Sequence, residues 1–489
     1  MPTSSAALTT GAARDVSPGV NPCVVVYIAV AGVVLLLMML LGLVLRLAQA
    51  EWLSMPPDLF YEMMTAHGVG MVGIAGLAGA GIMWHFLSRY VGLSRGILVT
   101  NLVLFLAGVV MILAAVFLGG FAGAWTFLYP LPASSGGVWE PEAAGLYLGG
   151  LLVVGVGFLL FYLDAGRAII AEYGGLGAAF GWPFLIGSRR ARLPEPAVVA
   201  SAMVIIVNTL GLISGAAVLG ISLINIAAPS FAIDPLLAKN MTYFFGHVFI
   251  NATIYMTVIA VYEILPGYTG REWKASKPFL WAWTGSTVLV LTAFPHHLLM
   301  DFVMPRWALV LGQVASYAAG LPVLAVTAYG ALTLVYRSGI RWDAASSLLF
   351  LSMFGWAAGI VPAIIDATIR VNLVMHNTMW VPGHFHFYLL IGMAAMVFGF
   401  MYRLGNDQQA GTSMLDRLAV WLFAVGGLGF ALVFLYSGKE GVPRRWAVHL
   451  SEWVAYDRLA SLFAFAVTAA VAVFALRFLL RVPRLIATR

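Results

Sequence analysis

Twelve apolar segments, each with at least the ~20 residues that a helix needs to cross the hydrocarbon core of a bilayer, run through almost the whole sequence. Backbone N–H and C=O groups must be paired within lipid, so an α-helix is the structure expected for each segment. The segments lie at roughly 23–47, 59–92, 97–123, 143–170, 197–227, 240–266, 278–303, 306–335, 345–369, 376–403, 415–437 and 457–481. The sequence therefore predicts an all-α membrane protein, a bundle of about 12 transmembrane helices.

The composition agrees with a membrane location. Hydrophobic residues make up 62% of the 489 residues and charged residues only 9%, whereas a soluble domain carries about 25% charged residues. The net charge of +6 comes from basic residues spread thinly along the chain, without a cluster that could follow a phosphate backbone. The expected partner of this surface is the lipid bilayer, and no nucleic acid is expected.

Domain organisation and orientation follow from the same pattern. Residues 1–22 are rich in Ser, Ala, Thr, Gly and Pro and are expected to form a flexible N-terminal leader, followed by a single transmembrane domain over 23–489. An even number of spans places both termini on one side, and most Lys and Arg residues lie in the loops of that side. By the positive-inside rule both termini are expected to be cytoplasmic.

Six of the nine histidines are expected at one depth, in the outer half of the membrane, on four different helices. Polar groups at that depth are costly and usually functional. These six are His67, His247, His296, His297, His384 and His386. Two others, His85 and His449, fit structural roles better, and His376, at the start of the tenth segment, is intermediate.

The spacing of these histidines predicts three metal centres. Successive helical residues turn by about 100°, so His384 and His386 point to opposite sides of their helix. His384 is then a single axial ligand to one heme, while His67 and His386 bracket a second, six-coordinate heme. A slight distortion at Pro295 lets the adjacent His296 and His297 join His247 in a three-imidazole copper site.

Four sequence motifs carry a resemblance to a known family. They are AHGVGMV around His67, FPHHLLMDF around His296 and His297, HNTMWVPGHFHFY around His384, and GVPRR ahead of Trp446. These motifs resemble subunit I of the heme–copper oxidase superfamily, and the HNTxWVxGHFH pattern is most similar to the B-type (ba-type) branch. The resemblance covers nearly the whole chain and makes 23–489 a catalytic domain.

The resemblance implies a role for each candidate residue. His67 and His386 would ligate a low-spin heme, with b-type expected, and His384 the iron of a high-spin heme. His247, His296 and His297 would hold copper, or a non-heme iron in its place. Arg444 and Arg445 match the pair that binds heme propionates, a role that suits the bidentate guanidinium. His376 and Asp301 are further candidates for the propionate region.

One position departs from the oxygen-reducing branches of this family. These branches place a redox-active tyrosine four residues after the first copper histidine, or on the seventh helix five residues before the histidine pair. Here those positions are Asn251 and Leu291. Dioxygen cleavage takes four electrons, one of them from that tyrosine, whereas coupling two NO molecules takes only two. Asparagine is not oxidisable, so the sequence favours a respiratory nitric oxide reductase.

Two alternatives stay open. In a B-type cytochrome c oxidase that reduces oxygen and pumps protons, the missing tyrosine would come from elsewhere, for example Tyr255 or Tyr243. In a heme-free membrane transporter, the histidines would be incidental, and the purified protein would show no Soret absorbance. The best-known NO reductases of the superfamily carry glutamate at position 251 with non-heme iron. Asn251 together with the B-type motifs favours copper here.

Electron and proton supply are also part of the resemblance. The single cysteine, Cys23, excludes a CxxCH heme-attachment site and a thiolate copper centre in this chain. A copper-containing subunit II, fed by cytochrome c or a small copper protein, is the implied electron entry, in a prokaryotic cytoplasmic membrane. Tyr262 matches a proton-path position of B-type oxidases, and Val258 departs from it. Further path candidates are Thr257, Ser316, Thr327 and Tyr329.

Overall fold

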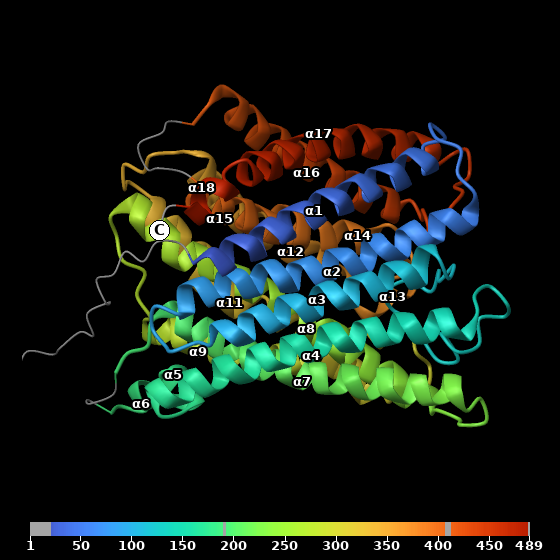
Figure 1. Cartoon of the computed structure of the whole chain (residues 1–489), viewed down its shortest axis with the longest axis horizontal. Coiled ribbons are helices and arrows are strands. Elements are labelled where there is room, and N and C mark those ends of the chain that lie inside the picture. The colour runs from blue at the N-terminus through green and yellow to red at the C-terminus, as the bar shows by residue number, and fades with distance from the viewer. Residues whose placement is uncertain (1–20, 189–191, 406–411, 488–489) are drawn as a thin grey trace, which may run out of the picture.

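The described residues, 21–188, 192–405 and 412–487 of a computed structural model, form a bundle of long helices that run side by side (Figure 1). The first half contains α1 (Pro22–Gln49), α2 (Pro57–Leu87), α3 (Arg95–Phe117), α4 (Pro141–Tyr173), α5 (Leu176–Ala179), α6 (Trp182–Leu185), α7 (Pro196–Ala227) and α8 (Pro235–Thr269). The second half contains α9 (Lys277–Ala293), the 3-10 helix η1 (Phe294–Leu298), α10 (Arg306–Ala319), α11 (Leu321–Val335), α12 (Ala344–Asp366), α13 (Ile369–Met375), α14 (Trp380–His386), the π-helix η2 (Phe387–Ala394), α15 (Ala395–Gly405), α16 (Met414–Lys439), α17 (Val454–Leu479) and α18 (Val482–Ala487).

The expected all-α membrane bundle is confirmed. Within the described residues, 11 helices are long and apolar enough to cross a membrane. The remaining expected segment, the seventh at 278–303, forms the 17-residue α9, which continues directly into η1. Of the expected leader, only Asn21 and Pro22 lie within the described residues, and the Asn21 side chain caps α1 by accepting a bond from the Cys23 N–H.

Two helices differ from the segments expected from the sequence. The segment at 306–335 is divided at Gly320, because Pro322 has no N–H to continue the hydrogen-bond ladder of α10. The tenth segment was placed at 376–403, but α14 begins only at Trp380. His376 caps the short helix α13 instead of opening the long one, which corrects its expected position.

The histidine-bearing helices form the centre of the bundle. Of the membrane-spanning windows, 89% of α8, 83% of the span Trp380–Gly405 and 72% of α2 are buried. In Figure 1, α1, α16 and α17 lie on one side of this centre, while α4 and α7 lie on the other. Side chains on the central helices therefore face protein on most sides and have few routes to lipid.

Glycines allow helices to approach closely around α14. A Cβ atom on Gly438 of α16 would lie 2.0 Å from the backbone nitrogen of Trp380, so no other residue fits there without moving the backbone. On the opposite side, a Cβ on Gly359 of α12 would lie 2.9 Å from the Cβ of Phe387. Close packing of this kind is how membrane helices gain van der Waals contact. It fixes the position of the HFH motif between α12 and α16.

A buried charge network joins α1 to α17 beside the central helices. Arg46, 7% exposed, donates to the carboxylate of Asp457 at 3.2 Å. The other carboxylate oxygen of Asp457 accepts from Nδ1 of the buried His449 at 2.7 Å. All three groups are buried and paired, which keeps the cost of placing charge in the bundle low.

Candidate metal centre

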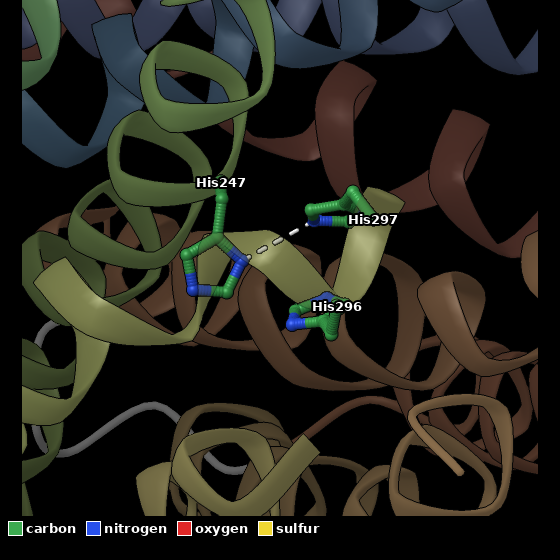
Figure 2. Close-up of side chains that lie close together, drawn as sticks. All are labelled: His247, His296 and His297. Carbon is green, nitrogen blue, oxygen red and sulfur yellow. Dashed lines mark hydrogen bonds between the residues drawn. The ribbon is translucent and has the colours of Figure 1, made fainter. Parts of the chain in front are cut away.

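Three imidazoles converge between α8 and η1 (Figure 2). His247, His296 and His297 each offer one ring nitrogen, and these three atoms lie within 4.8 Å of one another. Nδ1 of His247 is 3.3 Å from Nε2 of His297, and Figure 2 shows the rings directed toward a common space. This is a donor set suited to copper, zinc or iron.

The 3-10 turn explains how two neighbouring histidines reach one site. Residues 294–298 form η1, so the distortion expected at Pro295 is present. The ring centroids of His296 and His297 are 4.0 Å apart, and that of His247 is 4.8 Å from His296. Gly312 of α10 admits this turn, because a Cβ atom there would lie 2.8 Å from the backbone nitrogen of His296.

A serine on α10 orients His296. Nδ1 of His296 lies 2.8 Å from the carbonyl oxygen of Ala293 and 2.7 Å from Oγ of Ser316. The hydroxyl proton of Ser316 can go to the carbonyl of Gly312 at 2.7 Å, so its oxygen accepts from the imidazole N–H. This arrangement places the proton on Nδ1 and leaves the Nε2 lone pair available for a metal.

Ser316→Ala is expected to weaken metal binding about 10-fold, at the low end of the ~10–100-fold range for outer-shell partners, because the Ala293 carbonyl still accepts from His296. Metal content measured after dialysis against graded chelator tests this expectation. Ser347→Ala, a serine substitution on α12 remote from the histidines, serves as the control. Equal metal retention by both variants would contradict the role of Ser316.

A second pair of histidines is held in the same tautomer. Nδ1 of His67 lies 2.8 Å from the carbonyl of Met38, and Nδ1 of His386 lies 2.6 Å from the carbonyl of Pro382. Both rings therefore donate through Nδ1 and keep Nε2 for a ligand. Gly42 of α1 makes room for His67, since a Cβ there would lie 2.9 Å from its ring.

One cavity connects all six histidines. It has a volume of about 450 Å³, within the ~300–1,000 Å³ typical of ligand sites, and its walls carry the five histidines of the two preceding groups as well as His384. Other predicted site residues on its walls are Asn251, His376, Arg444 and Arg445. Asp301 is not among the lining residues; its carboxylate pairs with Lys239 at 2.7 Å.

The arginine pair lies on the wall of this cavity. Arg445 has a backbone φ of +66°, a strained conformation for a residue with a Cβ, and it donates to the hydroxyl of Thr126. Partial burial and the like charge of Arg445 lower the pKa of Arg444 to about 10. Two guanidiniums held this close repel each other, and an anion between them would remove that cost.

The expected proton-path residues divide into two groups. The hydroxyls of Tyr262 and Thr327 are 2.5 Å apart and join α8 to α11. Thr257 instead donates to the carbonyl of Ile254 on its own helix, and Tyr329 is 67% exposed. Ser316, the fourth candidate, binds His296. These contacts do not form a continuous chain of hydrogen bonds to the cavity.

The histidines expected to be structural lie apart from the cavity. His85 contacts Arg89 at 3.2 Å, and its ring packs edge-on against Phe86 and Phe400. His449 bonds Asp457 and Gln49. Neither is among the residues that line the cavity.

Sequence reasoning missed Asp366, whose carboxylate lies 4.0 Å from Nδ1 of His384. The only signal was an acidic residue at the end of an apolar segment.

Comparison with known proteins agrees with this geometry. Residues 23–472 match the sequence model of the family described as cytochrome c and quinol oxidase polypeptide I. The chain belongs to this family. As a heme–copper oxidase subunit I, it is an oxidoreductase with many membrane-spanning helices. The family implies bound hemes and copper, and the imidazole tautomers described above leave the nitrogens that such groups need.

Individual relatives are distant. The cytochrome c oxidase polypeptide 1 of Halobacterium salinarum is 24% identical over 436 residues, which cover 86% of this chain and 70% of that protein. The cytochrome c oxidase subunit 1 of Thermus thermophilus is 25% identical over 236 residues, covering 44% of this chain and 41% of that protein. A heme–copper terminal oxidase dimer solved by cryo-EM superposes with a TM-score of 0.78 over 97% of this chain and 85% of that chain, at 19% identity, and shares the fold.

Proposed function

We propose that this chain is the catalytic subunit of a respiratory nitric oxide reductase, which converts two NO, two electrons and two protons to nitrous oxide and water. The observation that carries the proposal is Asn251. It lies one helical turn after His247 on the wall of the cavity, where oxygen-reducing relatives of the type it resembles carry a tyrosine. A site without an oxidisable side chain at this position suits a reaction of two electrons better than one of four.

The proposed cofactor assignment follows the family resemblance, and the tautomers of His67, His296 and His386 agree with it. His67 and His386 would hold a low-spin heme of b type, His384 a high-spin heme, and the cluster of His247, His296 and His297 copper rather than iron. When bound, the high-spin heme and the copper supply the two electrons of the reaction. Arg444 and Arg445 would bind heme propionates, with His376 close by.

The amide of Asn251 keeps its oxygen and one N–H free. Its Nδ2 donates to the carbonyl of His247 at 2.7 Å, so the amide nitrogen is directed back to its own helix. The remaining oxygen can only accept a hydrogen bond. At the cavity wall it would orient a protonated species or a water molecule next to the three imidazoles. Tyrosine would place an oxidisable, proton-donating group there instead.

The wider assignment remains part of the same proposal. Both termini would face the cytoplasm of a prokaryotic inner membrane, with the metal layer toward the outer face. Electrons would come from cytochrome c or a small copper protein through a copper-containing subunit II, since this chain carries a single cysteine. Proton pumping is not proposed, because the hydroxyl contacts around Tyr262 do not continue to the cavity.

The deciding experiment measures NO consumption and oxygen consumption in one preparation of the purified complex with the same electron donor. NO reduction is expected to be the faster reaction, and Asn251→Asp is expected to keep it because a carboxylate also accepts hydrogen bonds. Asn251→Leu removes that oxygen and is expected to lower NO turnover. Oxygen reduction faster than NO reduction, accompanied by proton ejection, would overturn the proposal.

A specific contact favours oxygen reduction as the second candidate. Tyr243 lies one turn before His247 and its ring stacks on His297, with centroids 5.4 Å apart and planes 15° from parallel. It lines the cavity, so a tyrosine is present beside the three histidines after all. If Tyr243 were the redox-active group, Tyr243→Phe would abolish oxygen turnover. The nitric oxide reductase proposal predicts that NO turnover survives this substitution.

A further inference from the structure

His384 differs from the other candidate ligands in what its second ring nitrogen faces. His67, His296 and His386 each direct Nδ1 to a backbone carbonyl, a neutral acceptor. Nδ1 of His384 is buried and has no hydrogen-bond partner among the described residues. The polar group in front of it is a carboxylate.

That carboxylate belongs to Asp366, the last residue of α12. Its Oδ2 is 4.0 Å from Nδ1 of His384, about 1 Å longer than an ordinary N–H···O bond of ~3.0 Å. Asp366 is only 6% exposed and lies on the wall of the same cavity. A small rotation of either side chain would close the gap, and such contacts commonly tighten when a site is filled.

The local structure holds Asp366 in this place. Nδ2 of Asn372 donates to the backbone carbonyl of Asp366 at 2.7 Å and lies 3.4 Å from its Oδ1, which leaves Oδ2 for His384. The close approach at Gly359 packs α12 against Phe387, three residues after His384. Arg444 is near enough for its positive charge to attract the carboxylate.

We infer that Asp366 is a positioning residue that accepts the Nδ1–H of His384 and makes this imidazole a stronger electron donor than the histidines of the low-spin site. The inference rests on the proposed heme ligation by His384. A carboxylate acceptor raises the basicity of a metal-bound histidine more than a carbonyl does. Both proposed heme sites therefore use histidine, but the imidazole of His384 is the stronger electron donor.

The consequence concerns the iron at His384. A more basic ligand stabilises the oxidised metal, so the high-spin heme has a lower reduction potential than it would have with a carbonyl acceptor. It also stiffens the bond between iron and imidazole. Both effects are absent at His67 and His386, which makes the low-spin heme an internal reference in every measurement.

The experiment uses the purified complex with Asp366→Asn, which keeps the shape of the side chain and an acceptor oxygen but removes the charge. We expect the iron–histidine stretching band of the reduced high-spin heme to move to lower frequency in resonance Raman spectra. The midpoint potential of that heme is expected to rise, while that of the low-spin heme stays unchanged. Asp366→Glu is expected to restore part of both shifts.

A matched control removes another carboxylate, whose side chain is only 10% exposed. Glu263 of α8 accepts from Tyr90, in the turn after α2, and is not among the residues lining the cavity, so Glu263→Gln should leave both heme signals unchanged. An unshifted band and potential in Asp366→Asn, with both hemes present, would overturn the inference and leave the proposed function intact. Absence of any heme from the native protein would overturn the proposed function itself.

Discussion

His386→Ala is expected to remove the low-spin heme and with it the electron supply of the catalytic centre. Its Nε2 is left free by the bond from Nδ1 to the carbonyl of Pro382, and Phe430 and Phe434 pack edge-on against the ring. Loss of an axial ligand should cost more than the ~10–100-fold that follows removal of an outer-shell partner. The low-spin absorption band and steady-state turnover are the two measurements.

The control for this variant is His85→Ala. His85 is also a histidine within a transmembrane helix, but it contacts Arg89 and two phenylalanine rings away from the cavity. This variant should retain both heme bands and nearly full turnover. If His386→Ala kept the low-spin band, or if both variants lost it equally, the assignment of His386 as a ligand would be wrong.

Arg46→Met is expected to have the largest effect on stability. The substitution keeps the length of the side chain but leaves the carboxylate of Asp457, 3% exposed, without its cation. Breaking a buried ion pair by removing one partner costs about 3–5 kcal/mol, and the bond from His449 should keep the loss near the lower end. The midpoint of thermal unfolding in detergent measures this loss.

Two further variants test the cause. The double variant Arg46→Met with Asp457→Leu removes both charges and should be more stable than the single variant, because no unpaired charge is left buried. Arg192→Met breaks an exposed pair with Glu172 and should cost at most ~1 kcal/mol. Equal losses for Arg46→Met and Arg192→Met would show that the buried network does not stabilise the bundle.

The helical bundle could be predicted from sequence because lipid leaves few alternatives. A long apolar segment must be a helix there, so α1, α8 and α17 fall within a few residues of the expected ranges. The errors occurred where the chain leaves regular α-geometry. The break at Gly320 and the capping of α13 by His376 depend on local backbone conformation and tertiary packing, which hydropathy does not report.

The candidate site was predictable to the level of which histidines share one cavity. Helical spacing placed His384 and His386 on opposite sides of one helix, and the structure directs the first toward Asp366 and the second toward Phe430. The side chains that face the second ring nitrogen of a candidate ligand were not predictable in the same way. Ser316 and Asp366 reach their histidines from other helices, and a sequence gives no distance between residues so far apart.

The π-helix η2 lies between α14, which carries His384 and His386, and α15, which packs into the bundle. Residues 387–394 contain wider turns than an α-helix, so the chain after Ala394 is rotated relative to where a regular helix would place it. The face that α15 packs into the bundle is thereby independent of the direction in which the preceding imidazoles point. A single-residue deletion within 389–394 would change the direction of His384 and His386 relative to α15 while leaving every side chain of the motif intact. The geometry around the two histidines can thus change through helical phase alone, with both imidazoles kept.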